Sequence, residues 1–438
     1  MSLVARIEAA TEAVEGVMLR PVFGRIVEVR AQSLRGHLMG ARLGAICEIP
    51  TPGGAPLRAQ IVGVGREDVF LTPFGGTEGV MVGARIQTAA QSLSLSLPAN
   101  LLGRVVDVFG LPMDDGDPFR GPFARVPVHR SAPDAMRRPA ISDVFATGVR
   151  VIDSMATLGA GQRIGIFGPP GTGKTSLMGM LARRCEADVV VVGLVGERGR
   201  EVREFAEEVL PAELRQRAVI VAATSDRPAV QRALCAFSAT SIAEHFRDQG
   251  KRVFLLIDSL TRTARALREI GLAAGEAPVR RGYPASVYPA LPALIERAGR
   301  GQSGDITAMY TVLTEGEIES DPIAAEVKSL TDGHIVLERA LAERGHYPAI
   351  DIRASLSRSM SRIVSDGHAD DARTVRGHLA KYAEVELLLQ VGEYQEGMDE
   401  AADEAIARYG EIERYCRQKV DETSAFDESV AGLERLCR

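Results

Sequence analysis

The chain has 438 residues, of which 45% are apolar and 25% charged, and its net charge is −6. This composition excludes a disordered or a collagen-like protein, and the length predicts two to four domains, with three as the central value. Five scattered cysteines without a C-x-x-C pair exclude a disulfide scaffold and indicate free thiols in a reducing compartment. No apolar run reaches the roughly 18–20 residues that cross a bilayer, and residues 1–15 lack the apolar core of a signal peptide.

Residues 1–20 are predicted to contain an amphipathic N-terminal helix. Leu3, Ile7, Ala10 and Val14 recur at helical spacing within residues 2–15, and Gly16 follows as a terminator. Such a helix packs on its own domain or docks on a partner or a neighbouring subunit, and the residues leave both possibilities open.

Residues 21–95 are predicted to form a small β-barrel domain. Short β-rich runs alternate with Gly- and Pro-containing turns at 50–54 and 73–76, and the predicted strands are 24–30, 43–49, 57–64, 68–72 and 84–88. Barrels that bind oligonucleotides stack bases on aromatic side chains over a basic face. Phe23, Phe70 and Phe74 are the only aromatic residues here and lysine is absent. We therefore expect a structural barrel within a ring and no specific nucleic-acid binding.

From residue 96 to 365, apolar strands alternate with helical stretches. The predicted strands are 189–193, 218–222, 253–257 and 306–313, and the predicted helices are 175–184, 200–210, 227–249 and 289–297. This alternation predicts an α/β core with a mostly parallel sheet covered on both faces. Residues 366–438 predict a helical C-terminal domain, with one apolar stripe at Tyr382, Val385, Leu388 and Leu389 and a weaker one along 402–416.

A phosphate-binding loop is the strongest signal in the sequence. The run from Gly168 to Thr175 matches G-x-x-x-x-G-K-[ST] between a predicted strand, 163–167, and a predicted helix. Backbone N–H groups of such a loop turn toward phosphates, the lysine reaches the β- and γ-phosphates, and the hydroxyl ligates Mg²⁺. The predicted nucleotide-binding residues are Gly168, Pro169, Pro170, Gly171, Thr172, Gly173, Lys174, Thr175 and Ser176.

Two carboxylates follow predicted strands. Asp258 ends the apolar run 253–258, where an open α/β sheet binds its ligand, so it is predicted to hold Mg²⁺ together with Thr175, partly through water. The alternative is a helix-capping Asp before Ser259. No Glu follows Asp258, so the group that orients the attacking water comes from elsewhere. Glu197 follows the strand at 189–195 and is one candidate, with a plain surface residue as the alternative.

Several longer motifs together resemble one family. The segments 193–205 (GLVGERGREVREF), 256–282, 283–297, 332–341 and 345–358 (GHYPAIDIRASLSR) are similar to the rotary-type RecA-fold ATPases, and most closely to the type III protein secretion ATPases of flagella and injectisomes. The resemblance covers about residues 20–420 and implies the three-domain plan of barrel, RecA-like ATPase core and helical domain. The GPPGTGKT loop departs from the usual G-x-G-V-G-K-[ST] of the family, while its Gly, Lys and Thr are retained.

The resemblance implies roles for particular residues. Glu197 would polarise the attacking water, with Glu201 behind it, and Arg198 would help to bind the γ-phosphate of ATP. Tyr347 would stack on adenine, and Arg358 would be an arginine finger inserted into the neighbouring subunit's site. Because one chain carries all these parts, a homohexamer of this chain is expected to complete its own sites.

The resemblance also implies partners and a place in the cell. It implies a coiled-coil stalk protein in the ring pore, a peripheral regulator or stator at the N-terminus, and secretion chaperones with their substrates. The enzyme would work in the cytoplasm at the inner-membrane export apparatus, touching the membrane only peripherally through the export gate. Whether the system is flagellar or an injectisome stays open. A catalytic subunit of a rotary ATP synthase or ion pump and an RNA translocase are the alternatives; the first needs a separate non-catalytic subunit and the second an RNA-binding N-domain.

Overall fold

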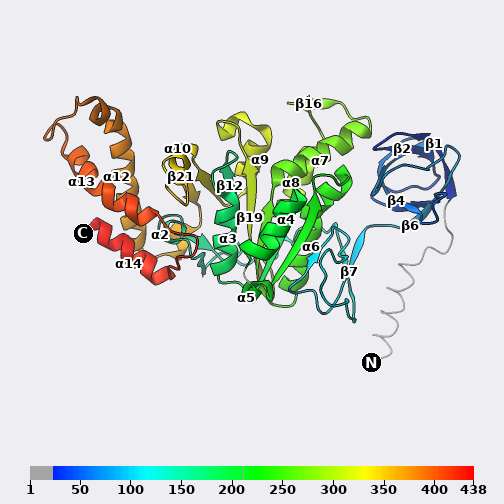
Figure 1. Ribbon diagram of the computed structural model, residues 1–438, viewed down its shortest axis with the longest axis horizontal. Helices are drawn as coiled ribbons and strands as arrows, with labels where there is room; N and C mark the ends of the chain where they lie inside the picture. The colour runs from blue at the N-terminus through cyan, green and yellow to red at the C-terminus, as the bar shows by residue number, and fades with distance from the viewer. Residues whose placement is uncertain (1–22, 211) are drawn as a thin grey trace.

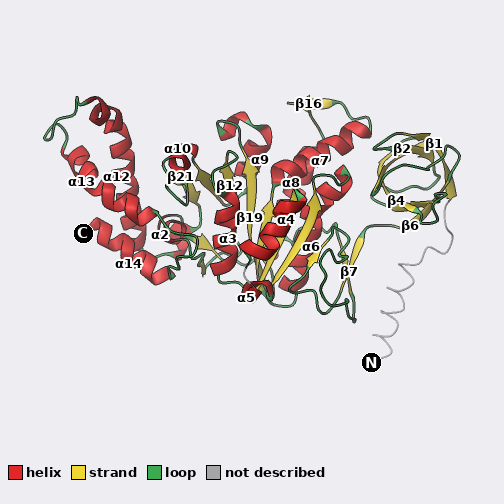
Figure 2. Cartoon of the chain, viewed as in Figure 1, coloured by secondary structure: helices red, strands yellow, loops and turns green. Residues whose placement is uncertain are grey.

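The computed structural model describes residues 23–210 and 212–438. The predicted N-terminal helix at 2–15 lies outside these residues. The chain forms an elongated molecule in which a β-barrel, a central sheet with its helices, and a set of C-terminal helices follow one another along the long axis (Figure 1). The secondary structure changes in the same order, from strands only, through mixed layers, to helices only (Figure 2). The predicted order of architectures is confirmed.

The barrel is closed by six strands, although the sequence predicted five. They pair in the order β1-β2-β5-β4-β3-β6 around an apolar interior that includes Ile26, Ile61 and Leu71. The missed strand is β2, a four-residue strand whose Gly36 lies so close to β6 that a Cβ there would be 2.3 Å from Ile86. Local composition does not reveal such a close approach. The strands are β1 (Phe23–Val29), β2 (Leu34–His37), β3 (Ile46–Ile49), β4 (Leu57–Val64), β5 (Asp68–Pro73) and β6 (Arg85–Ala90).

The central sheet has nine strands, and most of its strands are parallel. The order is β21-β20-β12-β19-β15-β13-β14-β8, with β18 paired antiparallel to β19 and β21 antiparallel to β20. Residues along the inner strands are buried on both faces, as the continuous apolar runs predicted. The strands are β8 (Val105–Val106), β12 (Arg163–Gly168), β13 (Val189–Glu197), β14 (Ala218–Thr224), β15 (Arg252–Asp258), β18 (Gly299–Arg300), β19 (Asp305–Leu313), β20 (Gly333–Leu337) and β21 (Ile350–Ser357).

Helices cover both faces of this sheet. Alternate residues of β14 and β15 enter two different cores, since Val219 and Val253 pack with one set of helices and Ile220 and Phe254 with the other. The first set is α6 (Ala229–Arg247), α7 (Leu260–Ala273), α8 (Val287–Ile295) and α9 (Pro322–Leu330). The second set includes α2 (Arg150–Met155) and α3 (Lys174–Arg184). The helix predicted at 200–210 is instead α4 (Gly199–Glu204) followed by a π-helical turn, η2 (Phe205–Val209).

Short elements complete the core and its connections. The linker after the barrel pairs β7 with β9, and β10 pairs with β11. The remaining elements are β7 (Ser94–Leu97), β9 (Ala124–Pro127), η1 (Ala135–Arg137), β10 (Val144–Phe145), β11 (Leu158–Gly159), α5 (Ala212–Arg215), β16 (Pro278–Arg280), β17 (Tyr283–Pro284), η3 (Ile318–Ser320), α10 (Arg339–Glu343) and α11 (Met360–Ile363).

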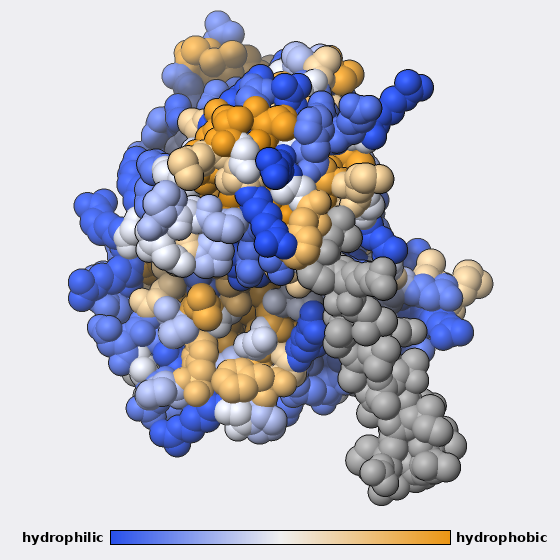
Figure 3. Space-filling view, turned by 90° about the vertical axis from the view of Figure 1, so that its right-hand side faces the viewer, coloured by the Kyte–Doolittle hydropathy of each residue, from blue (hydrophilic) through white to orange (hydrophobic). Residues whose placement is uncertain are grey.

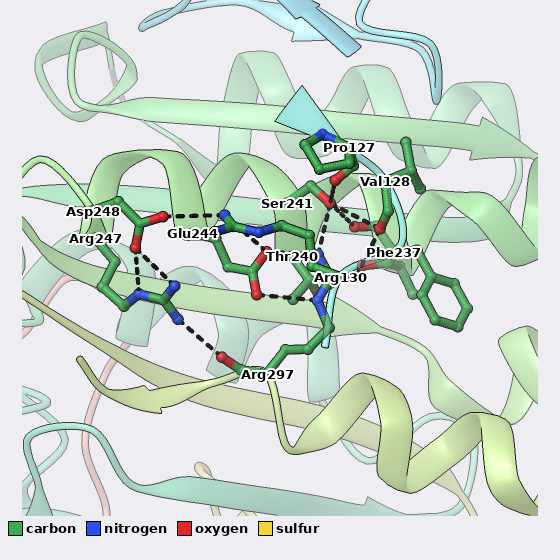
Figure 4. Close-up of polar contacts among 11 residues, drawn as sticks. Pro127, Val128, Arg130, Phe237, Thr240, Ser241, Glu244, Arg247, Asp248 and Arg297 are labelled. Carbon is green, nitrogen blue, oxygen red and sulfur yellow. Dashed lines mark hydrogen bonds and ion pairs between the residues drawn. The ribbon is translucent and has the colours of Figure 1, made fainter. Parts of the chain in front are cut away.

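A buried polar network joins this linker to the core (Figure 4). Arg297, just after α8, makes two hydrogen bonds of 3.1 and 2.6 Å to the Glu244 carboxylate on α6. Arg297 also donates to the Val128 carbonyl in the linker and to Ser241 Oγ, each at 2.8 Å. Both charged side chains are 1% exposed. The pair therefore fixes three separate chain segments to one another, with every charged partner satisfied.

The C-terminal part is helical, as predicted. It consists of α12 (Asp366–Val391), α13 (Glu400–Cys416) and α14 (Phe426–Cys437), and Leu433 of α14 packs in the second core. The predicted stripe on α12 is only partly buried, because Val385 is covered while Leu388 is 38% exposed. Tyr382 instead stacks on Tyr409 of α13 with ring centroids 3.6 Å apart. Among the described residues, no helix combines the length and hydropathy of a membrane span.

Candidate active site

The phosphate loop follows β12 and leads directly into α3. Gly171 and Gly173 have φ values of +83° and +82°, which residues with a Cβ rarely adopt. Lys174 Nζ donates to the carbonyl oxygens of Gly168 and Pro169, at 2.8 and 2.7 Å. Burial lowers the pKa of Lys174 to about 8, against the opposing effect of Asp258 and Glu197. The loop thus holds its cation among backbone oxygens at the position where phosphates would replace them.

The hydroxyl and carboxylate predicted to hold a metal lie at the same edge of the sheet. Thr175 is exposed at the start of α3, and Asp258 ends β15, where Thr311 Oγ1 donates to its Oδ1 at 2.5 Å. Burial raises the pKa of Asp258 above its usual value. Within residues 23–210 and 212–438 no group of three His, Cys, Asp or Glu residues could hold a metal by itself. This donor set of two oxygens fits Mg²⁺, which is commonly held by one or two protein oxygens, phosphates and water.

Glu197 is the last residue of β13 and its side chain is 14% exposed. It forms an ion pair with Arg262 of α7. Arg262 Nε lies 2.9 Å from Glu197 Oε1, its Nη2 donates to Oε2 at 3.1 Å, and its Nη1 donates to the Gly196 carbonyl at 2.8 Å. Burial raises the pKa of Glu197 to about 8, and the neighbouring carboxyls of Glu201 and Asp258 add to the rise. The hydrogen bond with Glu197 lowers the pKa of Glu201. The two neighbouring carboxyls thus have pKa values shifted in opposite directions, with Glu197 the weaker acid of the two.

Sequence reasoning did not identify Arg262, and Arg198, predicted to help bind the γ-phosphate of ATP, lies on the surface beside Glu201. Arg198 is 77% exposed in its side chain and its Nη1 donates to Glu201 Oε1 at 3.0 Å, so it does not point at Lys174 or Glu197 here. Arg262 lies one helical turn beyond Asp258, in the run Asp258-Ser-Leu-Thr-Arg262. That spacing after a strand end is a signal that sequence reasoning could have used, because a residue there faces the same sheet edge.

Tyr347 lies against the phosphate loop. A Cβ on Gly173 would be 3.3 Å from Tyr347 Cε1, and the ring is 44% exposed. The Tyr347 ring borders a cavity with Ser176 and Met180 of α3 and with residues 418–421, which connect α13 to α14. Gln418 N donates to the Tyr347 carbonyl at 2.9 Å. The C-terminal helical part therefore supplies one wall of this cavity, a contribution that no local pattern predicted.

Arg358 lies at the opposite end of the sheet from the phosphate loop. It follows β21, whose last residue, Ser357, pairs with Gly333 at the beginning of β20. Its backbone N–H donates to the Asp332 carbonyl, and Asp332 N donates to the carbonyl of Arg163, the first residue of β12. The phosphate loop begins at Gly168, five residues further along β12, about 17 Å at 3.3 Å per residue. The Arg358 side chain is exposed there.

Family models match the chain in three adjacent regions. The nucleotide-binding domain of the ATP synthase alpha/beta family matches residues 148–357, the beta-barrel domain of that family matches 22–88, and the T3SS EscN ATPase C-terminal domain matches 364–435. The type 3 secretion system ATPase of Sinorhizobium fredii is 48% identical over 418 residues, which cover 95% of this chain and 92% of the relative. The chain belongs to the type 3 secretion system ATPases.

Other members and a solved structure agree with this membership. The SPI-2 type 3 secretion system ATPase of Salmonella typhimurium is 49% identical over 94% of each chain, and the flagellum-specific ATP synthase of Bacillus subtilis is 42% identical over 94% and 95%. The structure of the assembled ATPase EscN of enteropathogenic E. coli is similar with a TM-score of 0.90 at 41% identity, covering 95% of this chain and all of that one. The chain is thus an ATP-hydrolysing enzyme of type III secretion, and the resemblance seen in its motifs is confirmed.

Proposed function

We propose that this secretion ATPase works as a homohexameric ring in which each subunit's Arg358 completes the ATP site of its neighbour. The proposal rests on the distance along β12 between Arg358 and the phosphate loop of the same subunit. Arg358 is anchored at the first residue of that strand, and the phosphate loop begins at the last. An arginine side chain reaches about 7 Å, so it does not span the roughly 17 Å to its own loop. A head-to-tail contact between identical subunits places it at a neighbour's loop and closes into a ring.

Exposed apolar side chains support self-association at the barrel. His37 at the end of β2 and Arg85 at the start of β6 both pair with Arg25, so the loops 38–45 and 74–84 leave the barrel at one end. Figure 3 shows apolar patches among hydrophilic residues on the side of the molecule that carries the barrel. Clustered exposed apolar residues mark interaction sites. The exposed apolar residues of these two loops are Met39, Leu43, Met81 and Val82.

Hydrolysis follows from the groups gathered at the sheet edge. Glu197 accepts a proton from water as the water oxygen bonds to the γ-phosphorus, and the bond from phosphorus to the ADP oxygen breaks. Lys174 moves from its carbonyl partners to the β- and γ-phosphates, and Arg262, already at the Glu197 carboxylate, adds positive charge beside the leaving phosphate. Arg198 turns from Glu201 to the γ-phosphate, and Tyr347 stacks on adenine. Thr175 and Asp258 would hold Mg²⁺, which neutralises charge on the phosphate oxygens when bound.

The relatives support proposals on the partners and the location of the enzyme. A solved structure of EscN contains its central stalk EscO, so we propose a coiled-coil stalk in the pore of this ring as well. Identities of 47–49% to type 3 secretion ATPases, against 42–45% to flagellum-specific ones, favour an injectisome. We further propose a regulator at the N-terminal segment, release of chaperones and unfolding or loading of export substrates, and a place at the cytoplasmic face of the export apparatus. The domains would divide at residues 20, 95 and 365.

The ATPase rate per subunit, measured over a wide range of protein concentration, tests the ring. Self-completion by identical subunits predicts that specific activity rises steeply with concentration and then levels off. A chain that binds ATP and stays inactive at every concentration needs a different subunit to complete its site. That outcome would favour the catalytic subunit of a rotary synthase instead.

A further inference from the structure

The peptide that carries Arg358 is held by residues at the start of β12. Arg358 N donates to the Asp332 carbonyl at 3.0 Å. Gln162 Nε2 donates to the same carbonyl at 2.9 Å and to Ser357 Oγ at 3.1 Å, and the Gln162 side chain is buried. The Arg358 N–H and the side chain of the preceding Ser357 are thus bonded to one small group of atoms. Asp332 is at its centre.

The Asp332 carboxylate is in turn bound by Arg163. The backbone N–H and Nε of Arg163 each donate to Asp332 Oδ2 at 3.0 Å, and Nη2 donates to Oδ1 at 3.1 Å. A fourth bond runs from Asp332 N to the Arg163 carbonyl at 2.8 Å. The side chains are only 15% and 28% exposed, and Arg163 Nη1 lies 2.5 Å from Glu296 Oε2. Because the planar Arg163 guanidinium is bound on two of its edges, both its orientation and its distance from the Asp332 carboxylate are fixed.

Arg163 is also the first residue of the strand that ends in the phosphate loop. Gly168 closes β12, and its carbonyl receives Lys174 Nζ. β12 lies inside the sheet, paired with β19 along its whole length and with β20. A strand bonded on both sides moves as a unit, so the position of the phosphate loop and the position of Arg163 are linked.

We propose that Asp332 and Arg163 are positioning residues for the finger Arg358, and that β12 connects a subunit's own nucleotide site with the finger it offers to its neighbour. This inference rests on the proposed role of Arg358. In a purely structural role, the pair would hold the edge strand β21 in place, and its loss would affect the protein in the same way with or without Arg358. The two roles differ in whether the effect of Asp332 disappears when the finger is absent.

A double-mutant cycle of Asp332→Asn and Arg358→Ala distinguishes the positioning role of Asp332 from a purely structural one. Rates are measured on the full chain at a concentration where specific activity has levelled off, with binding of a fluorescent ATP analogue and size-exclusion elution as second readouts. We expect Asp332→Asn to lower kcat about 10- to 100-fold, as misplacement by about 1 Å does, while analogue affinity stays within about twofold. In the Arg358→Ala background the same substitution should cost nothing further. Asp143→Asn, which removes the ion pair with Arg300 at the same sheet edge, is the matched control and should leave kcat unchanged.

An equal loss from Asp332→Asn with and without the finger would overturn the proposal, as would a wild-type rate for Asp332→Asn. If Asp332→Asn fails to fold, Arg163→Lys takes its place. Lysine keeps the positive charge but cannot bind the Asp332 carboxylate through several nitrogens at once. A wild-type rate for Arg358→Ala alone would instead contradict the proposed function of the finger. That result is distinguishable, since it does not depend on Asp332.

Discussion

Removing one member of the buried pair of Arg297 and Glu244 is expected to destabilise the core strongly, and Arg297→Met tests this. The substitution keeps the apolar length of the side chain and removes its charge. It leaves the Glu244 carboxylate, 1% exposed, without its two hydrogen bonds, and it frees the Val128 carbonyl and Ser241 Oγ (Figure 4). Among the residues that the structure describes, the only other cation within 4 Å of that carboxylate is Arg130, whose Nη1 is 3.7 Å away.

The size of the effect follows from burial. Removing one partner of a buried ion pair costs about 3–5 kcal/mol, because the remaining charge stays desolvated. Arg130 can move closer and recover part of this, so we expect about 3 kcal/mol. For a folding unit of 150–250 residues each kcal/mol shifts the melting temperature by about 2–4 °C, so Tm should fall by about 6–12 °C.

Thermal unfolding followed by circular dichroism and calorimetry measures the shift. Arg203→Met is the control, because Arg203 forms an exposed ion pair with Glu207 on the surface, and it should leave Tm unchanged. Glu244→Gln should cost less than Arg297→Met, since the amide oxygen still accepts from Arg297. A Tm change below about 2 °C for Arg297→Met would contradict a desolvated, unpaired Glu244 and show that Arg130 or water satisfies the carboxylate.

Four further predictions concern the active site. Lys174→Ala should abolish hydrolysis and weaken ATP binding, and turnover at the wild-type rate would disprove the phosphate-loop assignment. Glu197→Gln should bind ATP and assemble but not hydrolyse. Because burial raises the pKa of Glu197 to about 8 and its ionised form is the base, kcat/KM of the native enzyme should rise as the pH increases from 6.5. Burial also lowers the pKa of Lys174 to about 8, so the profile should be a bell that rises about eightfold from pH 6.5 to a maximum near pH 8 and falls above it. A flat profile would place the base elsewhere. Asp258→Asn should raise the Mg²⁺ concentration needed for half-maximal rate at least tenfold, and an unchanged Mg²⁺ titration would remove Asp258 from the metal site.

Local patterns predicted where the parts of the candidate site that lie on one strand and its following turn are found, while the catalytic role of Glu197 came from the resemblance to a family. The phosphate loop, Asp258 and Glu197 each follow an apolar strand, and parallel strands deliver their carboxyl ends to one edge. The same holds for the order of domains, since periodicity changes from strands to alternating elements to helices. Arg358 was found only through the resemblance to a family.

Contacts between distant segments were not predictable in this way. Val420 borders the cavity beside Tyr347 because Arg184 Nη2 donates to its carbonyl and Gln418 bonds to the Tyr347 carbonyl, across more than 70 residues. Strand β2 was missed because its four residues carry little β-pattern and are held by their neighbours β1 and β5. The hydrogen bonds from Arg163 to Asp332 likewise depend on the pairing of β20 with β12. In each case the tertiary fold, not the local run of residues, makes the contact.

The central claim, that each Arg358 acts on a neighbour, is tested most directly by mixing two inactive variants. Arg358→Ala keeps its own water-activating carboxylate, and Glu197→Gln keeps its finger. Mixed at equal amounts and followed through a single turnover of ATP, they should recover a rate at least tenfold above either variant alone, because some sites then combine an intact Glu197 with a neighbour's intact Arg358. A mixture no faster than the sum of its parts, with mixed assembly shown by size-exclusion chromatography of labelled subunits, would contradict a finger that acts between subunits.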